Sequence, residues 1–328
     1  MEIIKKLSKP KKSIVFDTYW KFAAKRQDIF FNKINNKTPL TSDPVLERHR
    51  FTNVYRASDR VSQYLIRNVI YKQDSKFTNQ DLLLRILLFK IFNKISTWEY
   101  LESLVKSITV DNFDSELYSK LLSEAKETKE VIYSGAYIMT SGKSIFGHNF
   151  KHENHLELLK QYVQCGKLIQ IIENAKSMEE VYKILLNIPT FGSFLAYQYT
   201  IDINYSTLTN FSEMDFVKAG PGAKDGIKKC FNDRGDFSDE DIIKYMCDIQ
   251  EKQFELLNLE FKSLWGRKLQ LIDCQNLFCE VDKYSRVIHP EISGISNRTR
   301  IKQIYKPEKN KIDYLFPPKW NLNVSLGG

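Results

Sequence analysis

A short turn between two predicted helices is the part of the sequence that most directly suggests chemistry. Residues 187–196 read Asn-Ile-Pro-Thr-Phe-Gly-Ser-Phe-Leu-Ala, so one helix must end before Pro189 and the next begins after Gly192. The first backbone N–H groups of a helix point outward and bind a phosphate without a charged side chain. We therefore predict a phosphate contact at Gly192 and Ser193; the alternative is an ordinary corner between two helices.

A second group of polar residues falls on one predicted helix near the C-terminal end of the chain. Asn276, Glu280 and Lys283 are spaced at i, i+4 and i+7 and share a face, and Asp273 lies one turn earlier. So dense a polar face beside apolar residues predicts the lining of a pocket. The alternative is a Glu280–Lys283 ion pair that fixes the fold.

Basic side chains in two further places are candidates for phosphate contacts. Arg56 and Arg60 form a cluster with an aspartate, and Lys218 and Lys224 lie close to a Gly-Pro-Gly turn. Arginine can bind a phosphate through two parallel hydrogen bonds, although such a cluster can also be purely structural.

The segment Ser141–Ser144 resembles the end of a phosphate-binding P-loop. The complete motif needs a glycine five residues before Gly142, and Tyr137 stands there. We therefore expect no bound nucleotide and assign Lys143 to a contact with a phosphate of a nucleic acid.

Three histidines, His148, His152 and His155, have the spacing of metal ligands on one helix face. Their neighbours are polar, which favours a solvated face. We predict no metal and no cofactor.

The elements that position these residues are mostly helices. Capping boxes at Thr78, Ser177 and Ser238 predict helices over residues 78–95, from 178 to the residue before Pro189, and 239–265. Strand-like alternation is confined to short segments such as Val131–Met139 and parts of the last forty residues. The predicted fold class is mainly α with short, minor β elements.

Composition and charge narrow the class of protein. The chain has 328 residues, 42% of them hydrophobic and 27% charged, which is typical of a globular protein with a real core. Neither a membrane-spanning segment nor a secretory signal is visible, and five cysteines without close pairs indicate reduced thiols in a cytoplasm.

The formal net charge of +9 is concentrated near the two ends. Residues 1–12 contain five lysines against one glutamate, and residues 297–319 contain seven basic residues against two acids. Basic ends on a balanced body predict a polyanionic partner, namely DNA; the alternative is that they only aid solubility.

The turn at 187–196 resembles the hairpin of the helix-hairpin-helix DNA glycosylases, whose pattern is Leu-Pro-Gly-φ-Gly. Ile188, Pro189 and Gly192 fit that pattern, and Ala196 fits the small residue that it has in the next helix, whereas Thr190 stands where its first glycine is expected. The resemblance implies a catalytic aspartate a little over twenty residues later, and Asp215 follows Gly192 by 23 positions. No lysine follows the hairpin directly, so the resemblance does not extend to the strand-cutting lyases.

A wider resemblance covers most of residues 50–290. The similar phrases lie at residues 51–71, 87–101, 191–206, 211–223 and 271–286. They are similar to the helical domain of 5-hydroxymethyl-deoxyuridine DNA kinases and to the proteins called alpha-glutamyl/putrescinyl thymine pyrophosphorylases. The resemblance implies a basic N-terminal arm (1–50), a helical glycosylase-like domain (51–290) and a basic, irregular C-terminal extension (291–328). It also associates the chain with bacteriophage DNA hypermodification and antiviral defence.

Taken together, these features predict a monofunctional DNA glycosylase, a hydrolase that flips a modified pyrimidine out of double-stranded phage DNA and leaves an abasic site. A carboxylate stabilises the positive sugar of the transition state, with Asp215 the first candidate and Glu213 and Asp202 in reserve. Asp215 could instead cap the next helix, and Asp202 could be structural. The polar face at 273–283 and Tyr137 would line the base pocket. The alternatives are a transferase that adds an amino acid or polyamine to an activated 5-methyl group of thymine, or a base-binding module without catalysis.

Overall fold

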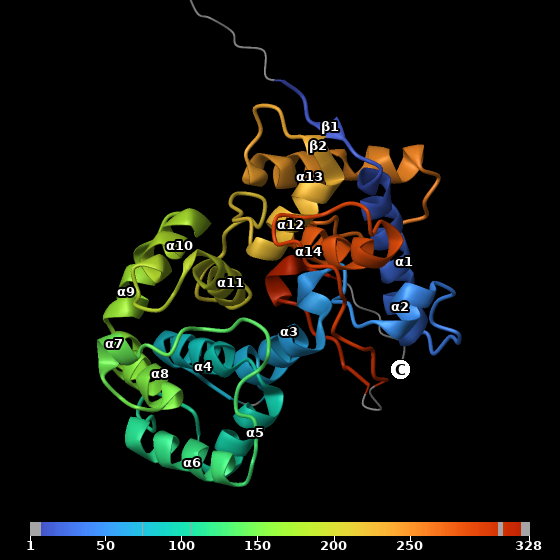
Figure 1. Ribbon diagram of the computed structural model, residues 1–328. Coiled ribbons are helices and arrows are strands. Elements are labelled where there is room, and N and C mark those ends of the chain that lie inside the picture. Colours follow the sequence, from blue (N-terminus) through green and yellow to red (C-terminus); the bar gives the residue numbers. More distant parts are fainter. Residues whose placement is uncertain (1–7, 74, 106, 308–310, 323–328) are drawn as a thin grey trace, which may run out of the picture. The chain divides into compact units, whose positions relative to one another are not determined.

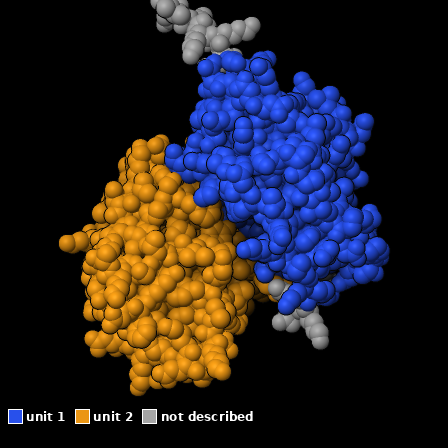
Figure 2. Space-filling model, viewed as in Figure 1, with its two compact units in different colours: residues 1–59, 216–312, 322–328 blue, residues 60–215, 313–321 orange. Residues whose placement is uncertain are grey.

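The computed structural model describes residues 8–73, 75–105, 107–307 and 311–322, and contacts divide the chain into two compact units (Figures 1 and 2). Unit 1 comprises residues 1–59, 216–312 and 322–328; unit 2 comprises residues 60–215 and 313–321. The mainly helical fold with a minor β element is confirmed. The three predicted segments stay a prediction, because units defined by contacts need not coincide with the domains of a family. Met1–Leu7, which include part of the predicted basic arm, and Lys309 lie outside the described residues.

Unit 1 is organised around one long helix, α14, against which α12 and α1 pack (Figure 1). The fit between α12 and α14 requires a glycine, since a Cβ added at Gly226 would lie 2.1 Å from the carbonyl oxygen of Phe278. Two short strands pair in antiparallel fashion, with Lys12 opposite Phe231. The elements of unit 1 are β1 (Lys11–Lys12), α1 (Val15–Ile34), α2 (Pro44–Arg48), η1 (Arg56–Ser58), α12 (Pro221–Cys230), β2 (Phe231–Asp233), α13 (Asp239–Leu256) and α14 (Leu271–Ile288).

Unit 2 has two helices, α4 and α11, that are buried on nearly all sides. The predicted capping box opens α4: the Thr78 hydroxyl accepts from the Asp81 N–H at 3.1 Å, and the Asp81 carboxylate accepts from the Thr78 N–H at 2.9 Å. The elements of unit 2 are α3 (Arg60–Tyr64), the π-helix η2 (Leu65–Ile70), α4 (Asn79–Phe92), α5 (Ile95–Leu104), α6 (Ser115–Glu127), α7 (Lys143–Phe146), α8 (Lys151–Leu159), the π-helix η3 (Lys160–Gln164), α9 (Lys167–Asn174), α10 (Met178–Leu186), α11 (Ser193–Asn204) and η4 (Pro318–Trp320).

The third predicted helix begins correctly at Asp239 but ends much earlier than expected, at Leu256. Asn258 takes a left-handed backbone conformation with φ of 50°, which turns the chain back on itself. The ring of Phe261 then stacks on that of Phe254, with centroids 4.2 Å apart. Burying these two rings against each other outweighs the continuation of the helix towards Trp265.

The predicted strand at Val131–Met139 is not formed. The backbone of this segment bonds to helices instead: the Thr97 hydroxyl donates to the carbonyl oxygen of Ile132 at 2.8 Å, and the Ser134 N–H donates to that of Phe92 at 2.9 Å. With its polar groups satisfied in this way, the segment needs no partner strand.

His155 of α8 fixes the same segment from its other end. Its side chain is fully buried, and Nε2 lies 2.7 Å from the carbonyl oxygen of Thr140. A carbonyl only accepts, so Nε2 carries the hydrogen and Nδ1 accepts from the Tyr133 hydroxyl at 2.9 Å. Burial lowers the pKa of His155 to about 4, and the ring stays neutral at neutral pH.

Protonation of His155 should therefore lower the free energy of unfolding. The pKa of His155 is lower in the folded chain (about 4) than in an unfolded one (about 6.5). The neutral ring therefore contributes its full share to the free energy of unfolding above pH 6.5, and this contribution is lost as the pH falls towards 4. We expect the free energy of unfolding to fall between pH 7.5 and pH 5 by about 2 kcal/mol more in the wild type than in His155→Gln. Denaturant titrations at both pH values test this, and equal losses in the two proteins would contradict it.

Candidate functional site

The turn between α10 and α11 has the local geometry expected of it. Helix α10 ends at Leu186, and Gly192 is the N-cap of α11 with extended backbone angles (φ −70°, ψ 166°). Gly192 brings no side chain to cap the helix, so the first N–H groups of α11 are not covered from that position. A Cβ added at Gly192 would meet no atom within 4 Å, so the space in front of the turn is open.

Thr190 stands where the glycine pattern of this turn has its first glycine. It adopts a left-handed backbone conformation with φ of 72°, the region that favours glycine. A β-branched residue is strained there, and the Thr190 hydroxyl is buried without a hydrogen-bond partner among the described residues. The shape of the turn is therefore kept at the expense of local strain.

A second loop of unit 2 lies against this turn. The ring of Tyr137 stacks on that of Phe194, the second residue of α11, at 5.7 Å and an interplanar angle of 2°. At Gly142 an added Cβ would lie 3.2 Å from the side chain of Thr190. The structure thus places Tyr137 against Phe194 and Gly142 against Thr190, and Lys143, the exposed first residue of α7, follows Gly142 directly.

The three candidate carboxylates occupy different environments. Asp202 is fully buried in α11, where its carboxylate lies 3.4 Å from Nζ of the equally buried Lys90. Glu213 is buried, whereas Asp215 is exposed and forms no hydrogen bond or ion pair through its carboxylate with the described residues. Asp215 alone of the three is open to a solvent-borne reactant.

Residues 205–215, here called the acidic loop, connect α11 to Asp215. The Asn204 side chain organises the loop: its carbonyl accepts from the Thr209 hydroxyl at 2.9 Å and from the Phe211 N–H at 3.0 Å. The alternative role of Asp215, capping the next helix, does not apply, because α12 begins at Pro221 with Gly220 as its N-cap.

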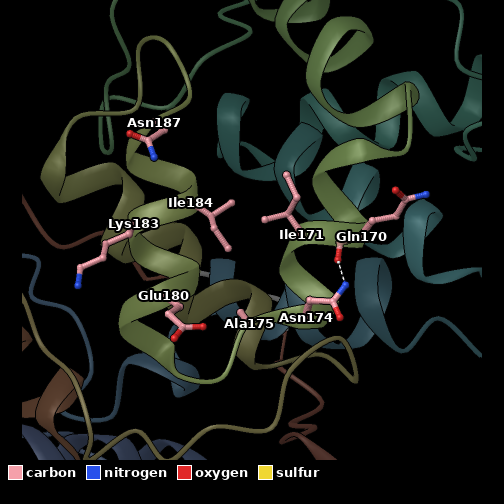
Figure 3. A pocket seen from close by; sticks show the side chains of 8 residues that line it. All are labelled: Gln170, Ile171, Asn174, Ala175, Glu180, Lys183, Ile184 and Asn187. Carbon is pink, nitrogen blue, oxygen red and sulfur yellow. Dashed lines mark hydrogen bonds between the residues drawn. The ribbon is translucent and has the colours of Figure 1, made fainter.

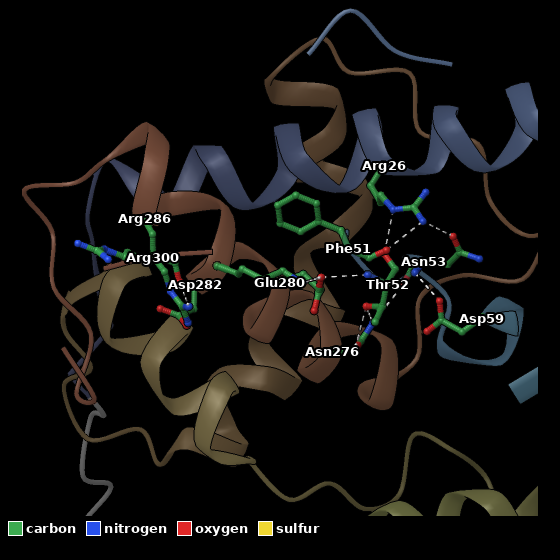
Figure 4. Close-up of polar contacts among 11 residues, drawn as sticks. Arg26, Phe51, Thr52, Asn53, Asp59, Asn276, Glu280, Asp282, Arg286 and Arg300 are labelled. Carbon is green, nitrogen blue, oxygen red and sulfur yellow. Dashed lines mark hydrogen bonds and ion pairs between the residues drawn. The ribbon is translucent and has the colours of Figure 1, made fainter. Parts of the chain in front are cut away.

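The polar face of α14 binds the backbone of residues 52–56 in unit 1, and Figure 4 shows its contacts with Thr52 and Asn53. Asp273 accepts from the Arg56 N–H at 2.9 Å, and Glu280 accepts from the Thr52 N–H at 3.0 Å. Asn276 donates to the carbonyl oxygen of residue 53 at 3.0 Å, and the Glu280–Lys283 ion pair forms at 2.8 Å. Burial raises the pKa of Asp273 to about 6. The role of this face in a base pocket stays a prediction.

Several candidate basic residues have structural partners. Arg56 is 3% exposed, so its guanidinium lies inside unit 1. Lys218 pairs with Glu240 at 3.6 Å, and Arg298 of the basic C-terminal segment pairs with the buried Asp225 at 2.8 Å. Lys224 is exposed and Arg60 is half-buried. Contacts of these side chains with DNA stay predictions.

The three histidines with metal-ligand spacing have separate surroundings. His152 lies 3.0 Å from the Ser123 hydroxyl, and His155 is held by Tyr133 and Thr140. Within the described ranges no group of His, Cys, Asp and Glu side chains could hold a metal ion. Every helix of those ranges is also too short or too polar to cross a lipid bilayer.

Sequence reasoning missed a groove of about 620 Å³ between α9 and α10 (Figure 3). Two isoleucines, Ile171 and Ile184, lie on its two sides, and Asn187 at the start of the turn lies at one end. Ile171 is 53% exposed. Ile171, an apolar residue on the exposed side of α9, is the sequence signal that could have pointed to this groove. Its lining residues are Gln170, Ile171, Asn174, Ala175, Glu180, Lys183, Ile184 and Asn187.

Comparisons with known proteins identify the family of this chain. A family model described as the helical domain of 5-hmdU DNA kinase matches residues 13–294. The chain belongs to this family. It is 28% identical over 286 residues to the 5-hmdU DNA kinase of Bacillus phage SP10, covering 82% of this chain and 45% of that protein. The chain thus spans less than half the length of this relative. No solved structure matches.

Substitutions at Gly192 test the turn. A side chain here would project into the open space before the N–H groups of α11, so Gly192→Leu should weaken DNA binding about tenfold or more while Gly192→Ala has a smaller effect. Both variants should keep the wild-type circular dichroism spectrum, because the added Cβ meets no atom. Binding is measured by fluorescence anisotropy at fixed salt. Unchanged affinity in Gly192→Leu would mean that the turn is only a corner between helices.

Proposed function

We propose that this chain binds DNA and acts on a pyrimidine that is modified at its 5-methyl carbon. The observation that carries the proposal is membership, over residues 13–294, of the family named for 5-hmdU DNA kinase. The relative from Bacillus phage SP10 bears the same name, which refers to a base with a hydroxyl on that carbon. The exposed Asp215 and the open turn at Gly192 supply a reactive group and a phosphate contact for such a substrate.

Of the two enzymatic candidates, transfer of an amino acid or polyamine to the 5-methyl carbon agrees better with membership of this family. An amine of an amino acid or polyamine would attack the activated carbon, forming a C–N bond while the bond to the leaving group breaks. The amine must lose a proton, and an exposed carboxylate can accept it. Asp215 is the residue that we assign to this role, because Asp202 is neutralised by Lys90 inside unit 2.

Hydrolysis of the glycosidic bond is the second candidate. One observation favours it: the exposed carboxylate of Asp215 lies 23 residues beyond Gly192, which ends a turn of the kind that can bind a phosphate. In this reaction Asp215 would stabilise the positive charge that develops on the sugar, and water would replace the base. Hydrolysis requires the base to leave the helical stack, because its glycosidic bond cannot be reached inside a duplex.

Salt dependence tests the DNA contact itself. Lys143, Lys218 and Lys224 are the exposed or half-exposed lysines among the candidates, and three neutralised phosphates correspond to a slope of about −3 in a plot of log affinity against log salt. Lys143→Gln should reduce that slope by about 1. The control is Lys252→Gln, which changes an exposed lysine of α13 with no predicted role. A salt-independent affinity in the wild type would contradict DNA binding altogether.

Replacing Asp215 by Asn tests the chemistry. Asn is nearly isosteric but carries no charge and accepts no proton, so we expect single-turnover rates to fall about 100- to 1,000-fold with DNA affinity unchanged. Asp111→Asn, at an exposed turn of unit 2, is the matched control. The assay uses duplex DNA with 5-hydroxymethyl-deoxyuridine or its activated ester, with and without an amine, and mass spectrometry of the products.

The products distinguish the candidates. A heavier nucleoside that depends on the amine identifies the transferase, and a free base with an abasic site identifies the glycosylase. Binding without either product identifies a base-binding module. A wild-type rate in Asp215→Asn would remove Asp215 from the reaction.

A further inference from the structure

A segment near the C-terminal end of the chain packs on unit 2, although the residues just before it belong to unit 1. This segment, Asp313–Asn321, is here called the strap. Its first part is anchored on α3 and η2: Asp313 pairs with Arg67 at 2.5 Å, and the Leu315 N–H donates to the Gln63 side chain at 2.8 Å. Phe316 is 5% exposed. The strap is therefore an integral part of unit 2.

The second part of the strap contacts the acidic loop directly. Nζ of Lys319 donates to the carbonyl oxygen of Ser206 at 3.0 Å and to that of Thr209 at 2.7 Å. The ring of Trp320 packs edge-on against Tyr205 at 5.7 Å and stacks with Phe316 at 6.0 Å. One cation and one aromatic ring thus hold the first half of the loop.

The loop depends on such contacts because it has almost no regular structure of its own. Side chains replace the hydrogen bonds of a helix or strand: Tyr71 donates to the carbonyl oxygen of residue 205 at 2.9 Å, and Asn204 donates to that of Phe211 at 3.0 Å. Lys319 supplies two further bonds of this kind, and both are charge-assisted. Loss of Lys319 would leave two carbonyl groups without their donor and would free the backbone on which Asp215 is carried.

We propose that the strap is a positioning element, in which Lys319 and Trp320 hold the acidic loop so that Asp215 is presented in a single conformation. This inference rests on the proposed function only in assigning the chemistry to Asp215. Lys319 is thus a positioning residue. Although it contributes to the positive charge of the C-terminal segment, its ammonium group bonds the protein's own backbone.

The matched variants are Lys319→Met, Lys319→Arg and Lys311→Met. Met removes the charge and both donors but keeps the length of the side chain, whereas Arg keeps a cation that can donate twice. Lys311 is exposed, forms no hydrogen bond or ion pair with the described residues, and tests the loss of the same charge from the same part of the chain.

Amide hydrogen exchange measures how well the backbone of the acidic loop is protected, and it needs no substrate. In Lys319→Met, the amides of residues 207–215 should exchange at least tenfold faster, with α4 and α11 unchanged. Lys319→Arg should restore most of the protection, and Lys311→Met should match the wild type. Wild-type exchange in Lys319→Met, or equal acceleration in Lys311→Met, would overturn the proposal. If Lys319→Met does not fold, Trp320→Leu is measured against the same criteria.

Kinetics then separate positioning from binding. With the assay for Asp215, Lys319→Met should lower the single-turnover rate at saturating DNA at least tenfold and change the DNA affinity less than twofold. A loss of affinity with an unchanged rate would overturn the inference, because it would make Lys319 a phosphate contact. If the wild type shows no activity, the proposed function fails, and the exchange experiment still decides whether the strap holds the loop.

Discussion

Helix α4 carries two cations, Arg85 and Lys90, whose side chains are almost completely removed from water. A buried cation is tolerated only where hydrogen bonds or an opposite charge replace its hydration. Arg85 donates to the carbonyl oxygens of Val69 and Ile108, and Lys90 lies beside Asp202 of α11. These contacts attach η2 and α11 to one central helix. The position of α11 therefore depends on matched charge as well as on apolar packing.

Helix α11 in turn separates the two parts of the candidate site within unit 2. The turn at Gly192 precedes it and the acidic loop follows it. Twelve residues of helix correspond to about 18 Å, and residues 195–204 are all buried, so the turn and the start of the acidic loop are held apart by a rigid element.

In unit 1, polar side chains of α14 stabilise an irregular segment instead of facing open solvent. Asp273 and Glu280 accept from backbone N–H groups of residues 52–56, and Asp282 pairs with both Lys229 and Arg286. A segment without regular structure must find partners for its backbone, and carboxylates of a neighbouring helix are strong acceptors. Asp273 and Glu280, which predict a pocket in the sequence, therefore stabilise the irregular segment at residues 52–56 through these hydrogen bonds.

The sequence by itself determined the features that depend on neighbouring residues. Capping boxes, the break at Pro189, the mainly α class and the family all follow from short-range patterns. The resemblance to the glycosylase hairpin singled out Asp215 by its distance along the chain from Gly192, and its role in a reaction stays a prediction. Only the tertiary structure decided which charges are buried and which are free. It paired Asp202 with Lys90, ended α13 at Leu256 through stacked rings, and brought Lys319 to the acidic loop across more than a hundred residues. Pairings of buried charges and contacts between distant segments leave no periodic pattern in a single chain, because they depend on where the other elements come to lie.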